Sequence, residues 1–205
     1  MCQNERVPKA VDRESRRREI AEALHRIAAR DGLEGVSVRT VAAEARMSAG
    51  AVQREFGTKD ELLGFAFQVA VDEVADRFGH VRIGPGHLTS VEALRQVLLG
   101  LLPTDERGLA RTRIWAAFYA HAAIDPLFAQ TLSALDDETR TRFVQLLEYA
   151  RDQGELAPGK DLEAVAELLL VVIDGLWMGC ARLPDGSSLD GQRAAIEAVI
   201  ALLER

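Results

Sequence analysis

The sequence predicts an all-α protein, with an N-terminal three-helix helix-turn-helix domain followed by a larger helical domain. Apolar residues recur at helical spacing along most of the chain, as in Ile20, Leu24, Ile27 and Ala28. No segment of the sequence alternates apolar and polar residues in the way that a half-exposed strand does. Capping residues and Gly or Pro breakers also divide the chain into about nine segments of helical length.

Cap signals indicate where these helices begin. Ser37 and Ser48 suit the N-caps of two short helices, because a serine hydroxyl accepts a hydrogen bond from a free N–H of the first turn. Thr58 and Glu61 have the spacing of a capping box, which opens a longer helix. The expected helices span residues 12–31, 38–45, a short segment from 48, then 58–81, 90–102, 105–123, 127–153, 161–181 and 188–204.

Charge is unevenly distributed along the 205 residues, although the net charge is −7. Residues 1–60 carry 12 Lys and Arg against 10 Asp and Glu, whereas the remainder carries 13 against 22. A polyanion binds where the local field is positive, whatever the total charge. Any nucleic-acid contact is therefore expected in a domain over residues 1–60, with a second domain over residues 61–205.

Several function classes lack the residues that they need. The N-terminal residues are polar and charged, unlike a secretory signal, and the apolar segment 164–181 is interrupted by Glu167 and Asp174. This segment therefore indicates a buried or interface helix rather than a membrane span. Cys2 and Cys180 are the only cysteines, and the histidines are scattered. We expect a cytoplasmic protein with no enzyme active site, no metal, no cofactor and no membrane partner.

A helix, a tight turn and a second short helix form the motif that lays a recognition helix in the DNA major groove. Three segments lie in and around this motif: VRTVA at 38–42, MSAGAV at 47–52 and FGTKDELL at 56–63. Together they resemble the N-terminal signature of the TetR family of bacterial transcriptional regulators. The resemblance covers about residues 13–65, and it implies a regulator whose N-terminal domain binds operator DNA.

Polar and small residues of this region are the expected DNA-facing positions, because Ala42, Val52 and Phe56 are apolar and should be core. Gln and Arg side chains can read base edges, Ser and Thr hydroxyls can hold phosphates, and a lysine can add its charge to a positive helix end. A glycine allows close approach to a neighbouring helix or to DNA. The expected DNA-binding residues are Arg39, Thr40, Ser48, Ala49, Gly50, Gln53, Arg54 and Lys59.

Three positions depart from the signature. Arg46 stands at the usual turn glycine, Gln53 stands where an aromatic residue is common, and Glu55 stands where His or Tyr is frequent. Glu55 brings negative charge near the expected phosphates, so it either points away from DNA or helps to reject wrong sequences. Two interpretations, a clamp on flanking phosphates or a solvated helix face, fit four arginines of the first helix: Arg13, Arg16, Arg17 and Arg18.

The resemblance also implies that the C-terminal helices enclose a cavity for a small-molecule effector. Trp115, Phe118 and Tyr119 share one helical face. For each candidate, ordinary core packing is the alternative, but as a set they indicate an apolar or aromatic effector. The expected ligand-binding residues are Phe65, Trp115, Phe118, Tyr119, His121, Tyr149, Trp177 and Met178.

The last two helices are too apolar to face solvent along their whole surface, and the resemblance implies that they form a homodimer interface. Leu169 and Val172 are the interface positions that we expect, and the last helix carries a stripe of Ala194, Ala195, Ala198, Val199 and Leu202. We expect a repressor that binds a palindromic operator as a homodimer and is released by its effector. The alternative is a helical small-molecule-binding or interaction module without specific DNA binding.

Overall fold

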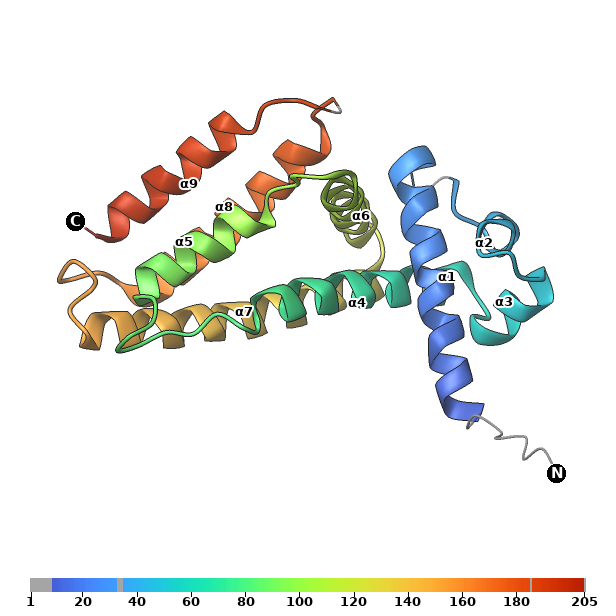
Figure 1. The fold of residues 1–205 in the computed structure, drawn as a ribbon, viewed down its shortest axis with the longest axis horizontal. Helices are drawn as coiled ribbons and strands as arrows, with labels where there is room; N and C mark the ends of the chain where they lie inside the picture. The colour runs from blue at the N-terminus through green and yellow to red at the C-terminus, as the bar shows by residue number, and fades with distance from the viewer. Residues whose placement is uncertain (1–8, 33–34, 185, 205) are drawn as a thin grey trace. The chain divides into compact units, whose positions relative to one another are not determined.

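The computed structural model describes residues 9–32, 35–184 and 186–204, and within these ranges it is all-α, as the sequence predicts (Figure 1). The β structure in these ranges is a single isolated bridge between Ile83 and Leu88. The expectations for residues 1–8, including Cys2, lie outside the described residues. The helices are α1 (Lys9–Asp31), α2 (Val38–Glu44), α3 (Ala49–Glu55), α4 (Lys59–Phe78), α5 (Ser90–Leu101), α6 (Glu106–Ala122), α7 (Pro126–Asp152), α8 (Leu162–Ala181) and α9 (Asp190–Leu203).

Serine hydroxyls begin the two short helices, as predicted. Ser37 Oγ accepts a hydrogen bond from the Thr40 backbone N–H at 3.1 Å, and Ser48 Oγ accepts one from Ala51 N–H at 3.1 Å. Thr58 Oγ1 caps α4 by accepting from Glu61 N–H at 3.1 Å. These bonds satisfy N–H groups that have no partner inside the helix, and so they fix the residues at which the helices start.

The chain divides into two compact units between Glu73 and Val74, inside α4. In the N-terminal unit α1 packs on α2, and α2 packs on α3. The predicted core residues Ala42, Val52 and Phe56 are all buried there. The first part of α4 belongs to this unit, whereas we expected the domain boundary at residue 60.

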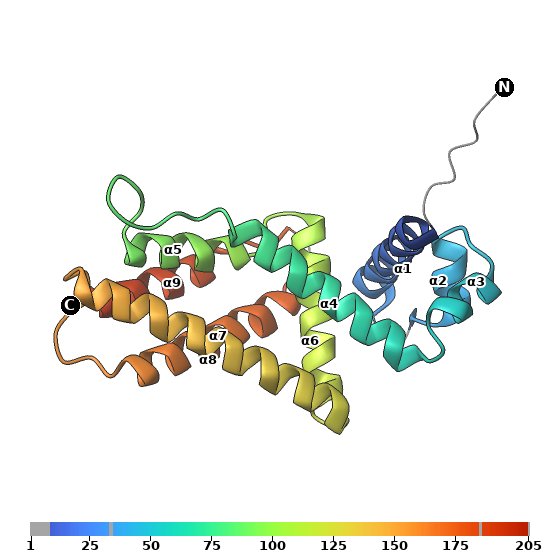
Figure 2. The ribbon, with the colours of Figure 1, turned by 90° about the horizontal axis from the view of Figure 1, so that it is seen from below.

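In the C-terminal unit α8 packs along α6 and α7, and α5 packs on α9 (Figure 2). With a mean hydropathy of 1.9, α8 is long and apolar enough to cross a membrane by length and composition. Here Leu169, Ile173 and Leu176 of this helix are buried within the unit. One apolar face of α8 therefore packs inside the unit, whereas residues on the opposite face, such as Leu168 and Val171, are exposed.

Candidate nucleic-acid interface and aromatic cluster

The turn between α2 and α3 is tight, and Arg46 gives it its shape. Arg46 has a φ of 56°, and among the described residues it is the one non-glycine residue with a positive φ. Met47 N–H donates to Ala42 O at 2.8 Å across this turn. The left-handed conformation favours glycine, so Arg46 preserves the turn geometry at a cost of about 1–2 kcal/mol.

The α3 helix, which we call the recognition helix, is anchored mainly by one side chain. Val52 is fully buried, whereas Gly50, Gln53 and Arg54 are exposed. All the expected DNA-binding residues are exposed, namely Arg39, Thr40, Ser48, Ala49, Gly50, Gln53, Arg54 and Lys59. Their contact with DNA stays a prediction, but each side chain is accessible to a partner.

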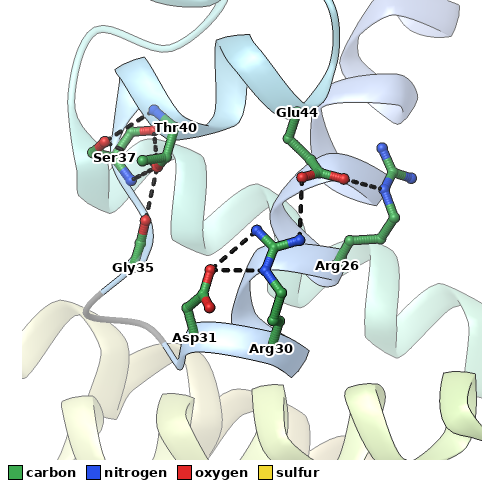
Figure 3. Close-up of polar contacts among 7 residues, drawn as sticks. All are labelled: Arg26, Arg30, Asp31, Gly35, Ser37, Thr40 and Glu44. Atoms are coloured by element: carbon green, nitrogen blue, oxygen red, sulfur yellow. Dashed lines mark hydrogen bonds and ion pairs between the residues drawn. The ribbon is translucent and has the colours of Figure 1, made fainter.

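Two of these residues also form hydrogen bonds that stabilise the starts of α2 and α3. Thr40 Oγ1 donates to Gly35 O at 2.7 Å and accepts from Ser37 N–H at 2.9 Å (Figure 3), while Ser48 Oγ caps α3. A Cβ added to Gly50 would meet no atom within 4 Å. Packing against α2 therefore does not require a glycine at position 50, and close approach to DNA stays a prediction.

Arginines of α1 hold α2 in place through Glu44 (Figure 3). Arg26 Nε donates to the Glu44 carboxylate at 2.8 Å, and Arg30 donates to it at 3.4 Å. The hydrogen bond from Arg26 holds the pKa of Glu44 below its usual value. This ion pair joins residues that are 18 positions apart, and so it links α1 to α2.

A second group of α1 arginines holds the C-terminal end of α3. Arg13 Nε donates to the Glu55 carboxylate at 2.9 Å, and an Arg16 nitrogen lies 3.8 Å from the other carboxylate oxygen. The Arg17 guanidinium lies over the Phe56 ring at 4.7 Å and over the Phe65 ring at 4.6 Å. Arg13, Arg16 and Arg17 thus contact α3 and the residues beyond it, whereas Arg18 pairs with Glu14 on the solvated face of α1. Phosphate contact by these arginines stays a prediction.

Trp115, Tyr119 and Trp177 come together in the C-terminal unit. The Trp115 and Trp177 ring centroids are 4.0 Å apart, and those of Trp115 and Tyr119 are 6.2 Å apart. Tyr119 Oη donates to Asp174 Oδ1 at 2.6 Å. The hydrogen-bond partner of Asp174, which interrupts the apolar segment of α8, is thus a tyrosine.

Burial raises the pKa of Asp174, and the hydrogen bond from Tyr119 opposes that rise. Asp136 of α7 also has a raised pKa, through burial and then the nearby charge of Asp174. Burial, followed by the bond to Asp174, raises the pKa of Tyr119. The aromatic cluster therefore borders a carboxylate that has lost part of its hydration. The sequence shows Asp174 inside an apolar segment, but it does not show that aromatic side chains lie beside it.

The other predicted ligand-binding residues are dispersed. Phe118 and His121 pack on the Phe128 ring, with centroids at 4.7 and 4.5 Å. Tyr149 and Met178 are 39% and 41% exposed. Phe65 belongs to the N-terminal unit, where it packs on Phe56 at 5.2 Å between ring centroids. The structure thus divides the predicted set among two small aromatic groups of the C-terminal unit and one of the N-terminal unit.

The accessible recognition helix after a tight turn defines a helix-turn-helix DNA-binding protein. Residues 20–64 match the model of the tetR family of bacterial regulatory proteins, and residues 90–204 match that of the C-terminal domain of BetI-type transcriptional repressors. The chain belongs to the TetR family of transcriptional regulators, which are not enzymes.

Individual relatives agree with this assignment. The regulator PksA of Bacillus subtilis is 34% identical over 83% of this chain and 80% of its own length. A transcriptional regulator from Rhodococcus is 33% identical, with a TM-score of 0.79 over 91% of this chain and 95% of its own. A Saccharomonospora viridis regulator solved in complex with choline shares the fold at 21% identity, with a TM-score of 0.78 over 94% and 100% of the two chains.

Proposed function

We propose that the protein is a cytoplasmic repressor that binds a palindromic operator as a homodimer and is released by a small-molecule effector. The observation that carries this proposal is the recognition helix, which exposes Gln53 and Arg54 while Val52 anchors it. Gln and Arg side chains can make two hydrogen bonds to the edge of one base in the major groove. Lys59 is exposed at the first residue of α4, where a helix N-terminus favours a backbone phosphate.

The homodimer is supported by an apolar face of α8 that the C-terminal unit leaves uncovered. Leu168, Val171 and Met178 are 41%, 59% and 41% exposed, and Gly175 between them is exposed too. A monomer seldom leaves such a row in water. Our expectation for Leu169 was wrong, because its side chain is fully buried inside the unit.

The last helix, α9, also exposes small residues. Ala194, Ala195 and Ala198 are exposed, and Leu202 is 56% exposed. Small side chains allow helix backbones to approach closely, and two copies related by a two-fold axis bury the same patch on each partner. A two-fold dimer presents its recognition helices symmetrically, and so the operator is expected to be palindromic.

The effector site is proposed at the aromatic groups of the C-terminal unit. Trp115, Tyr119 and Trp177 supply flat apolar surfaces suited to an apolar or aromatic effector. His121 Nε2 is buried, and no described residue is its hydrogen-bond partner. Because buried polar atoms are normally hydrogen-bonded, a polar group of the effector is a suitable partner for this nitrogen.

A second effector class, an organic cation, is favoured by Asp174. Its carboxylate is bonded to Tyr119, whose ring lies beside Trp115, so aromatic faces and a negative charge are available together. Quaternary ammonium groups bind to such combinations through cation–π attraction. The choline-bound structure of the Saccharomonospora regulator supports testing this class.

Footprinting of the purified protein on DNA upstream of its own gene tests the proposal. We expect protection of a palindrome that requires a higher concentration of an Arg54→Ala variant and is reduced when the effector is added. Choline and its uncharged isostere 3,3-dimethyl-1-butanol would then be titrated with tryptophan fluorescence. Response to choline alone supports the cationic class, and response to both supports the apolar class. The absence of any protected palindrome would favour the alternative of a helical binding module.

A further inference from the structure

Glu55, the last residue of the recognition helix, is almost enclosed by arginines of α1. Its side chain is 9% exposed, whereas the Arg13 side chain is 61% exposed and that of Arg16 is 38% exposed. Each carboxylate oxygen faces a different arginine, at 2.9 Å for Arg13 and 3.8 Å for Arg16. The pairing joins segments 42 residues apart, unlike the local pairs that decorate a solvated helix.

The residue that follows Glu55 is held by the same face of α1. Phe56 is buried, and the Arg17 guanidinium lies over its ring at 4.7 Å. The recognition helix has only seven residues, too few to be stable by themselves. Contacts from α1 to Glu55 and Phe56 therefore contribute to the orientation in which α3 is presented.

The same pairing lowers the positive charge of the α1 surface that is available to DNA phosphates. A guanidinium that is bonded to a carboxylate attracts a phosphate much less than an unpaired one, because the two charges largely cancel. Arg13 also borders an open groove of about 390 Å³ between α1 and α4, with Arg17, Phe65 and Val69 among its other lining residues. The Arg13 side chain therefore has room to swing away if the carboxylate is removed.

Phosphate contacts supply most non-specific affinity for DNA, whereas base contacts supply the sequence preference. We infer that Glu55 is a specificity-determining residue, which keeps Arg13 from phosphates and so weakens binding to unrelated DNA more than binding to the operator. The inference rests on the proposed DNA-binding function. It concerns discrimination between DNA sequences, whereas that proposal concerns the operator itself.

An E55Q variant of the full chain, with E14Q as its matched control, tests this role. Both changes remove one negative charge, but Glu14 pairs with Arg18 on the surface of α1 at 2.9 Å, where both side chains are about 70% exposed. Dissociation constants would be measured for the operator and for a scrambled duplex of equal length, between about 50 and 200 mM salt. Thermal melting of each variant would establish that it is folded.

We expect E55Q to bind the scrambled duplex roughly tenfold more tightly, with a salt slope steeper by about 0.9 for each additional phosphate that the protein neutralises. Operator affinity should change less, so that the ratio of the two affinities falls, and E14Q should resemble the wild type. The double variant R13Q/E55Q should return the scrambled-duplex affinity and slope close to wild-type values, because it removes one positive and one negative charge and so keeps the wild-type net charge.

Three outcomes would overturn the inference. Equal behaviour of E55Q and E14Q would mean that only total charge matters. An R13Q/E55Q variant that binds the scrambled duplex about tenfold more weakly than the wild type would mean that Arg13 already holds a phosphate. This double variant also serves as the test if E55Q alone fails to fold. A wild type that binds no DNA would instead contradict the proposed function, and the inference with it.

Discussion

The recognition helix α3 and the apolar helix α8 both bury one face and expose another, but the exposed faces have opposite chemistry. On α3 the exposed residues include Gln53 and Arg54, and on α8 they include Leu168 and Val171. A polar exposed face suits a hydrated, charged partner such as DNA, whereas an apolar face suits a second protein surface. An amphipathic helix therefore does not by itself identify a partner. Once the structure shows which face is buried, the chemistry of the exposed face indicates whether the partner is DNA or protein.

The largest expected effect separates the two faces of α8. Leu169→Asp places a charge at a fully buried position and should unfold the C-terminal unit, with a loss of more than about 4 kcal/mol. Val171→Asp, two residues away on a side chain that is 59% exposed, should leave the unit folded and yield monomers. Circular dichroism and light scattering distinguish the results. A folded, dimeric Val171→Asp protein would remove α8 from the proposed interface.

Substitutions on the exposed face of α3 should act on DNA binding without affecting the fold. Gln53→Ala and Arg54→Ala should each weaken operator binding by about 1–3 kcal/mol if both read bases. Lys59→Ala should weaken all duplexes alike and reduce the salt slope by about 1, as expected for one phosphate contact. Gel shifts with operator and scrambled DNA provide the measurement. Wild-type affinity in all three variants would show that α3 is not the DNA-reading element.

Acid should affect the two units in opposite directions. The pKa of Glu44 is lowered, so its ion pairs stabilise the N-terminal unit above the unfolded-state pKa of about 4.3 and are lost as pH falls through the folded-state pKa. The pKa of Asp174 is raised, so its contribution is present below about 3.9 and is lost as pH rises through its folded-state value.

Two isosteric variants measure this opposition. Glu44→Gln should lower the melting temperature at pH 7, and its effect should shrink as the pH falls through the folded-state pKa of Glu44, because the wild-type carboxylate then becomes protonated too. Asp174→Asn should raise the melting temperature at pH 7 by roughly 2 °C, with a smaller gain at low pH, because it removes a partly buried charge while leaving an oxygen to accept from Tyr119. The melting temperature of each variant would be compared with that of the wild type from pH 3 to 7. A change in the same direction for both variants at pH 7 would contradict the predicted opposition.

The smallest expected effect lies in the turn that sets the direction of α3. Arg46→Gly relieves the left-handed strain but adds freedom to the unfolded chain, and the net gain should be about 0.5–1 kcal/mol. Chemical denaturation measures this difference, with Ala45→Gly as a control at a neighbour whose φ is −78°. A destabilised Arg46→Gly protein would mean that the arginine side chain contributes more than its backbone strain costs.

Local signals predicted the N-terminal unit well. Ser37 and Ser48 cap α2 and α3 as expected, because a cap depends on residues within a few positions of the helix start. The contacts of Glu55 could not be predicted, since its ion pair with Arg13 spans 42 residues. A sequence pattern reports periodicity along one element, and it contains no information on which distant side chain will face a given carboxylate.

The C-terminal unit shows the same limit more strongly. Helical periodicity placed Trp115 and Tyr119 on one face of α6, and they do lie together. It could not indicate that Tyr119 bonds to Asp174, 55 residues away, or that Tyr149 is left partly exposed. The dispersal of the predicted ligand-binding residues thus reflects tertiary packing, which a single sequence without related sequences does not specify.

The anchoring of α3 mainly through Val52 has a consequence for the evolution of regulators of this kind. Because the exposed residues of α3 contribute little to the core, substitutions at Gln53 and Arg54 can accumulate after a gene duplicates without unfolding either copy. Diverged copies can then acquire separate target promoters while keeping one scaffold. Selection on which genes are controlled is thereby uncoupled from selection on stability.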